Sequence, residues 1–198
     1  KLAHINEYYF SAKLKEIAQL KAQGKPIVNL GIGNPDMPPS DATINALVEK
    51  AKQLNTHGYQ SYIGTPELRQ GLAGFYKSTY NVTFNSNSEV LPLLGSKEGI
   101  SFISNAFLNP GDKVLIPNPG YPTYTSATYL AGAEPIFYDL DEQNNWLPKF
   151  DSIEDKILNE VKLMWVNYPN MPTGSEGNVA YFEQLIAFAN KYKILICN

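Results

Sequence analysis

Strand-like and helix-like segments alternate along the second half of the chain, and this alternation limits the possible folds more than any other feature. Short apolar segments favour strands at residues 89–94, 113–117, 134–140, 161–168 and 193–197. Segments with helical periodicity lie between several of them, at residues 97–107, 122–131 and 179–191. Such alternation is typical of a mostly parallel sheet with helices on its faces. The sequence therefore predicts an α/β fold.

The first half of the chain has a looser pattern. Residues 10–23 place apolar side chains on one helical face, and Gly24 supplies the stop. The elements expected next are a short strand at 26–30, an irregular Gly- and Pro-rich segment at 31–36, a helix from Ser40 or Asp41 to about Leu54, a loop at 57–65 and a helix opened by Pro66.

Composition narrows the class of protein. The net charge of −3 and the pI near 5.4 lack the basic character of nucleic-acid binding, so no nucleic-acid partner is expected. No apolar run reaches membrane-spanning length, and the first ten residues lack the apolar stretch of a signal peptide. The single cysteine, Cys197, lies in an apolar segment and is interpreted as a reduced core thiol. We therefore expect a cytoplasmic protein with no membrane partner and no metal site.

Residues 95–99 (GSKEG) are the most informative motif, because they join an apolar segment to a helix. Amide groups at the start of a helix suit a phosphate dianion, and the Ser96 hydroxyl can donate a further hydrogen bond. The alternative is an ordinary turn in which Ser96 caps its own helix. The motif is not a P-loop, because the spacing to Gly-Lys-Ser/Thr is missing.

Two further motifs each come at the end of an expected strand, where ligands gather in open α/β sheets. Residues 118–124 (NPGYPTY) hold Tyr121 between two prolines, which stiffen the backbone and can present the ring to a flat cofactor. A tyrosine packed in the core is the alternative. Residues 167–174 (NYPNMPTG) form a fixed irregular loop, in which the Asn170 amide can reach a ligand oxygen or only cap a turn.

Together with residues 33–36 (GNPD) and 59–69 (YQSYIGTPELR), these motifs resemble in order and spacing the class I and II aminotransferases of pyridoxal-phosphate (PLP) fold type I. The likeness covers essentially the whole chain and points to the branch with aspartate, alanine and LL-diaminopimelate aminotransferases. It implies that residues 41–198 are the first part of the PLP-binding large domain, after an N-terminal arm and small-domain segment at 1–40. It also implies PLP as cofactor, an amino acid and a 2-oxo acid as substrates, and a homodimer with shared active sites.

The resemblance assigns roles to particular residues. Ser96 and Lys97 match the turn that binds the cofactor phosphate, and Lys97 is therefore not the Schiff-base lysine. Tyr121 matches the aromatic residue that stacks on the pyridine ring. Tyr59 matches, by its spacing, the tyrosine that reaches the phosphate of the neighbouring subunit's cofactor, with Tyr62 as the rival for this role.

Three weaker assignments follow from the same resemblance. Gly33 matches the position whose backbone faces the substrate carboxylate, where the lack of a side chain permits close approach. Residues 8–10 (YYF) resemble the arm that covers the partner subunit or the mouth of the site, and simple dimer packing explains them equally well. Tyr124, one helical turn after Tyr121, is a second aromatic candidate or a core residue.

Two departures from the family pattern concern the chemistry. The family's loop usually reads Asn-Pro-Thr-Gly, and its asparagine donates to the cofactor's phenolic oxygen, but Met171 stands there and cannot donate. Asn170 is the candidate to replace it; our hypothesis is that Asn170 stays near the cofactor without the usual bond. The aspartate that pairs with the ring nitrogen, the Schiff-base lysine and the carboxylate-binding arginines are all expected beyond Asn198.

These assignments predict that the full-length parent protein moves an amino group between an amino acid and a 2-oxo acid through PLP. The present chain carries cofactor-binding elements and no catalytic residue, so it is not expected to be competent alone. The alternatives are another fold type I lyase or synthase reaction, a sensor domain of a transcription regulator, and an inactive aminotransferase-like domain.

Overall fold

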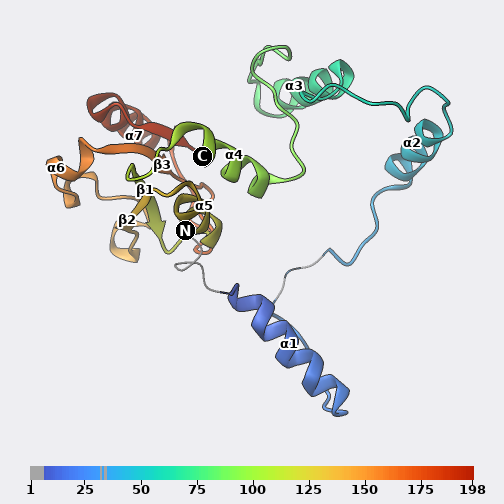
Figure 1. Cartoon of the computed structure of the whole chain (residues 1–198), viewed down its shortest axis with the longest axis horizontal. Helices are drawn as coiled ribbons and strands as arrows, with labels where there is room; N and C mark the ends of the chain where they lie inside the picture. Colours follow the sequence, from blue (N-terminus) through green and yellow to red (C-terminus); the bar gives the residue numbers. More distant parts are fainter. Residues whose placement is uncertain (1–6, 32, 34) are drawn as a thin grey trace. The chain divides into compact units, whose positions relative to one another are not determined.

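Figure 1 shows the computed structural model of the chain, which describes residues 7–31, 33 and 35–198. The described residues form two compact units, Glu7–Pro92 and Leu93–Asn198. The division expected after residue 40 concerns the domains of the parent protein, and it stays a prediction.

The unit Leu93–Asn198 is built on a four-stranded parallel sheet with the order β2-β1-β3-β4. Because parallel neighbours need crossover connections, helices join the strands, with α5 between β1 and β2 and α7 between β3 and β4. The predicted α/β fold with a parallel sheet is thereby confirmed. The strands are β1 (Lys113–Asn118), β2 (Glu134–Asp139), β3 (Val161–Trp165) and β4 (Leu195–Cys197).

Short helices complete this unit. The 3-10 helices η2 and η3 and the helix α6 lie between β2 and β3 in the sequence. The helices are α4 (Ser96–Phe107), α5 (Pro122–Ala131), η2 (Glu142–Asn144), η3 (Phe150–Ser152), α6 (Asp155–Leu158) and α7 (Val179–Tyr192).

Side chains of the central strand β1 alternate between two apolar cores, as the twofold period of a strand requires. Leu115 belongs to a core that includes Leu185 of α7, whereas Val114 and Ile116 belong to a core that includes Ile100 of α4. Helices α4 and α5 thus cover one face of the sheet and α7 covers the other. This arrangement explains the near-continuous apolar character of β1 and β3.

The unit Glu7–Pro92 consists of three helices and the segments between them: α1 (Tyr9–Ala22), α2 (Asp41–Ala51) and α3 (Pro66–Tyr80). The side chain of Ser40 caps α2 by accepting from the Thr43 amide, at 3.3 Å. The segment after α3 is held by the buried Arg69, whose guanidinium donates to the Ser86 carbonyl at 2.9 Å. Among the described residues, no helix has the length and apolar character needed to cross a membrane.

The strands expected at residues 26–30 and 89–94 do not form within the part of the chain that the structure describes. Both segments are apolar, yet Val28 and Leu30 are 82% and 91% exposed. A strand requires a neighbouring backbone to pair with, and apolar composition alone does not supply one. The prediction of these two strands is therefore wrong for the described residues.

The lone cysteine lies at the end of β4 and packs against the core that contains α4 and α5. Burial raises the pKa of the Cys197 thiol to about 11, which keeps it protonated at neutral pH. This environment agrees with a core thiol rather than a nucleophile.

Two neighbouring residues of α7 test the packing of this helix on the sheet. Leu185 is 1% exposed and Ile186 is 57% exposed. We expect Leu185→Ala to lower the free energy of unfolding of the full-length protein by about 2–5 kcal/mol, because it leaves a cavity in the core. Ile186→Ala should change it by less than about 0.5 kcal/mol. Chemical denaturation measures both, and equal losses would mean that α7 packs through another face.

Candidate functional site

A hollow of about 610 Å³ opens beside the carboxyl ends of the strands in the unit Leu93–Asn198. Its walls come from the first half of α4, from the turn after β1, and from the ends of β3 and β4 with the loop that follows β3. The lining residues are Leu93, Ser96, Gly99, Ile100, Ile103, Tyr121, Tyr124, Trp165, Asn167, Met171 and Asn198. The three motifs that the sequence singled out separately thus contribute to one hollow.

Helix α4 presents its N-terminus to this hollow. Gly95 precedes the helix with φ of 111°, a conformation that residues with a side chain rarely adopt. The Glu98 carboxylate reaches back to accept from the Leu94 amide at 2.6 Å. Among the described residues the Ser96 hydroxyl has no hydrogen-bond partner, so Ser96 does not cap its own helix. A hydroxyl and a helix start are therefore available to an anion.

The Tyr121 ring is half-buried and forms the aromatic wall of the hollow. It meets the ring of Tyr124 edge-on, with centroids 5.8 Å apart, and Tyr124 stacks on Trp165 at 4.9 Å. A Cβ on Gly120 would lie 2.4 Å from the Pro117 carbonyl oxygen, so only glycine fits this turn. The turn before α5 thus holds Tyr121 in place, and the neighbouring rings back it.

The two aromatic candidates of this motif differ in their surroundings. Tyr124 is buried in the core with α4, although its edge reaches the hollow, and burial raises the pKa of its hydroxyl. Tyr121 is more exposed, and the ammonium of Lys97 lies 5.8 Å from the centroid of its ring. Lys97 is otherwise exposed to solvent. Tyr124 is therefore a supporting residue, and Tyr121 is the ring that a flat ligand can contact.

The loop at residues 167–174 brings Met171, and not Asn170, into the lining of the hollow. Asn170 is 4% exposed. Its backbone N–H donates to the Ser175 carbonyl at 2.7 Å, and its backbone carbonyl accepts from the Gly174 N–H at 2.6 Å. Its side-chain oxygen is buried without a partner among the described residues. Met171 is 44% exposed. The side chain at the family's asparagine position is thus apolar and faces the hollow.

Residue types in the hollow decide what it can bind. Its lining carries no formal charge at neutral pH, so an anion would depend on the amides and hydroxyl at the start of α4. Apolar and aromatic side chains supply most of the wall, as in small-molecule sites of this volume. The described residues contain no group of three His, Cys, Asp or Glu side chains that could hold a metal ion. The hollow suits a flat ring that carries an anionic group.

The remaining predicted residues lie in the unit Glu7–Pro92. Tyr59 and Tyr62 are both fully exposed, and a Cβ on Gly33 would meet nothing within 4 Å. The ring of Phe10 contacts those of Tyr8 and Tyr9, at centroid distances of 5.6 Å, and all three are exposed. Their roles stay predictions.

Trp165 and Asn198 are among the residues of the hollow that were not predicted from the sequence. Trp165 ends β3, and its indole nitrogen is buried without a partner in the described part of the chain. Asn198 follows β4, and its side-chain oxygen accepts from the Tyr168 amide at 3.2 Å. Asn198 directly follows the predicted strand at 193–197, which is the one sequence signal that could have found it. Trp165 lies within the predicted strand at 161–168, and only the observed end of β3 places it at the hollow.

Comparison with known proteins agrees with this geometry. The LL-diaminopimelate aminotransferase of Halothermothrix orenii is 40% identical over 198 residues, which is 100% of this chain and 51% of that protein. The enzyme of the same name from Syntrophobacter fumaroxidans is 42% identical over 181 residues, covering 91% of this chain and 47% of that protein. The chain thus spans about half the length of the curated relatives it matches.

Solved structures share the fold. The apo structure of BacF from Bacillus subtilis superposes with a TM-score of 0.92 at 38% identity, over 97% of this chain and 49% of that one. An alanine aminotransferase from Pyrococcus furiosus gives a TM-score of 0.88 at 29% identity, over 99% of this chain and 50% of that one. Residues 25–197 match the family described as aminotransferase class I and II. The chain belongs to the class I and II aminotransferase family, with the α/β fold of its fold type I members.

Proposed function

We propose that the full-length protein transfers an amino group between an amino acid and a 2-oxo acid, with PLP as its cofactor. PLP is the cofactor of this family. The main support for the proposal is that the start of α4, the Tyr121 ring and the loop with Met171 line one hollow. The curated relatives make LL-diaminopimelate the first amino donor to assay, before alanine, aspartate and glutamate.

The residues of the hollow fit this cofactor. Ser96 has a hydroxyl with no partner among the described residues, at the start of a helix, where a phosphate dianion is favoured. Tyr121 offers a ring that a turn with an obligatory glycine holds in place. Lys97 adds a positive charge next to both. When bound, PLP supplies the electron sink for the amino-group chemistry.

Within the proposed site, the residues of this chain bind and orient the cofactor. The Ser96 hydroxyl and the backbone amides of the turn at Ser96 and Lys97 would hold the phosphate, and Tyr121 would offer its ring to the pyridine ring. Asn170 stays near the site without donating to the phenolic oxygen, because its side chain is buried outside the lining of the hollow. Met171 excludes water from that side of the ring.

The other unit contributes to recognition in this proposal. Gly33 offers its backbone to the substrate carboxylate, and the exposed Tyr59 reaches the cofactor phosphate of a partner subunit in a homodimer. A cytoplasmic location accords with a reduced cysteine.

Absorbance of the full-length protein tests the proposal. We expect purified protein mixed with PLP to show a visible absorption band that survives gel filtration. Addition of an amino acid donor should shift this band as the amino group moves to the cofactor. Protein boiled before mixing is the control. A protein that retains no PLP, or a band that no amino acid shifts, would contradict the proposed function.

The phosphate turn is tested by comparing two neighbouring side chains. Ser96→Ala removes a hydrogen-bond donor to a charged group, so it should weaken PLP affinity by about tenfold. Lys97→Met keeps the backbone amides and removes one exposed charge, so it should weaken affinity less. Equilibrium titration of the full-length apoprotein with PLP measures both. The reverse order would show that the turn has been misassigned.

The methionine in the hollow is tested by restoring the family's residue. An asparagine amide at position 171 can donate to the phenolic oxygen and favour its ionised form. Met171→Asn should therefore lower the pH midpoint of the colour change of the bound cofactor, whereas Met171→Leu should leave it in place. Spectra recorded across pH provide the measurement. An unchanged midpoint in the asparagine variant would mean that Asn170 already donates this bond.

A further inference from the structure

The loop that brings Met171 into the hollow is tied at both ends to one turn elsewhere in the chain. The Tyr168 hydroxyl donates to the carbonyl of Trp146 at 2.9 Å. The Ser175 hydroxyl donates to the carbonyl of Asn145 at 2.7 Å. Tyr168 and Ser175 flank Met171 in sequence, so consecutive carbonyls of the turn hold the loop on either side of it.

The turn that offers these carbonyls has an unusual backbone. Asn145 and Trp146 are both left-handed, with φ of 52° and 57°. This conformation costs about 1–2 kcal/mol for most residues with a side chain, whereas asparagine adopts it more readily, so the cost falls chiefly on Trp146. A pair of such residues persists only where surrounding contacts over-determine it, and backbone of this kind gathers near functional sites.

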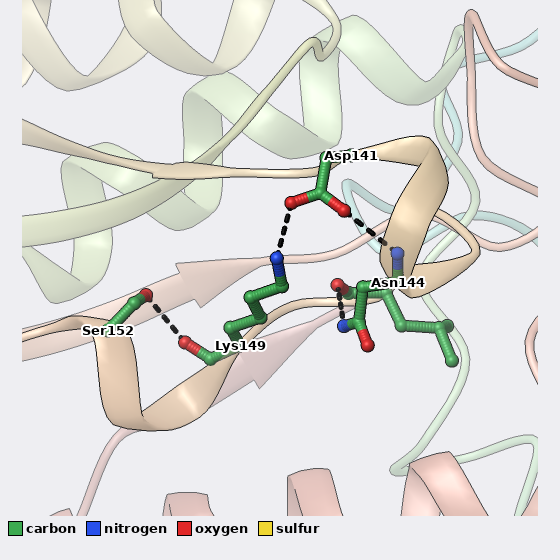
Figure 2. Close-up of polar contacts among 5 residues, drawn as sticks. Asp141, Asn144, Lys149 and Ser152 are labelled. Carbon is green, nitrogen blue, oxygen red and sulfur yellow. Dashed lines mark hydrogen bonds and ion pairs between the residues drawn. The ribbon is translucent and has the colours of Figure 1, made fainter.

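Asp141 holds the residues before and after this pair, and Figure 2 shows the two bonds of its side chain. One carboxylate oxygen accepts from the Asn144 amide at 2.8 Å and the other from the Lys149 ammonium at 2.5 Å. The Asp141 carbonyl accepts from the Trp146 amide at 2.8 Å. The Asn144 side chain closes the turn by donating to the Leu147 carbonyl at 2.7 Å. The hydrogen bond from Lys149 is the main cause that lowers the pKa of Asp141, so the carboxylate is ionised at neutral pH.

We propose that the turn at residues 141–149 is a positioning support for the cofactor loop, and that Tyr168 and Ser175 act through it on Met171 and Asn167. This inference rests on the proposed function, since it concerns the same hollow. The chain has no amide donor at position 171, so the wall of the hollow depends on backbone placement rather than on a bond from that side chain. Fixing both ends of the loop sets the distance between Met171 and a bound ring.

Ring packing holds Tyr168 independently of its hydroxyl, so the hydroxyl can be removed without loss of the ring contacts. The ring packs edge-on against Tyr181, at a centroid distance of 5.0 Å, and against Phe182, at 6.1 Å. A Cβ on Gly177 would lie 3.2 Å from Tyr168, so the backbone also approaches closely there. Tyr168→Phe therefore keeps these ring contacts and removes the hydroxyl, with its bond to Trp146 and its interaction with the Tyr181 hydroxyl, whereas Ser175→Ala removes a bond to the turn alone.

The test uses the full-length protein, with Tyr168→Phe and Ser175→Ala as variants and Tyr192→Phe as the matched control. Tyr192 lies on α7, and its hydroxyl donates to Asp155 at 2.6 Å. Each variant is titrated with PLP, the pH midpoint of its colour change is recorded, and its unfolding midpoint is measured. We expect Tyr168→Phe and Ser175→Ala each to weaken PLP affinity about three- to tenfold and to displace the pH midpoint. Tyr192→Phe should leave both cofactor readouts unchanged.

The outcomes separate this inference from the proposed function. A wild-type protein that binds no PLP contradicts the proposed function. If the wild-type protein binds PLP, and Tyr168→Phe and Ser175→Ala bind it with the same affinity and pH midpoint, the positioning support is overturned. The proposed function then stays in place. If Tyr168→Phe does not fold, Ser175→Ala decides the question. The positioning support is also overturned if Tyr192→Phe changes PLP affinity and the pH midpoint as much as the loop variants do. The effect would then be one of general stability.

Discussion

The parallel pairing of β1 with both β2 and β3 decides where the functional side chains of the unit Leu93–Asn198 meet. Parallel strands all end at one edge of the sheet, so segments that follow different strands become neighbours there. The turn with Tyr121 follows β1 and the loop with Met171 follows β3. The start of α4, which packs through Ile100 on the face that carries Val114, completes the hollow. Side chains from distant parts of the sequence thus share one site because of backbone pairing.

The chemistry of the hollow follows from which groups in it are already satisfied. The backbone hydrogen bonds of Asn170 close its own loop and its side chain lies outside the lining of the hollow, whereas the Ser96 hydroxyl lies in the lining and has no partner among the described residues. A free donor at a helix start selects an anion, and an apolar side chain at position 171 gives the ring a wall without a donor. The carbonyls of the left-handed turn at Asn145 and Trp146 accept hydrogen bonds from Tyr168 and Ser175, on either side of Met171. In our proposal this is the role of the turn.

The sequence predicted much of this because the signals for it are local. Apolar periodicity predicted the parallel sheet, and the turn chemistry of residues 95–99, 118–124 and 167–174 predicted the segments that line the hollow. Strand pairing is not local, which is why the expected strands at 26–30 and 89–94 were wrong. The support of the loop was beyond sequence reasoning for the same reason, since its two hydrogen bonds join residues 22 and 30 positions apart.

The central claim is that the start of α4 and two segments at strand ends form one cradle for PLP. A crystal structure of the full-length protein with PLP bound measures this most directly. We expect the cofactor phosphate within hydrogen-bond distance of the Ser96 hydroxyl. The pyridine ring should lie against Tyr121, with Met171 beside the phenolic oxygen. PLP bound elsewhere, or an Asn170 amide that donates to the phenolic oxygen, would contradict it.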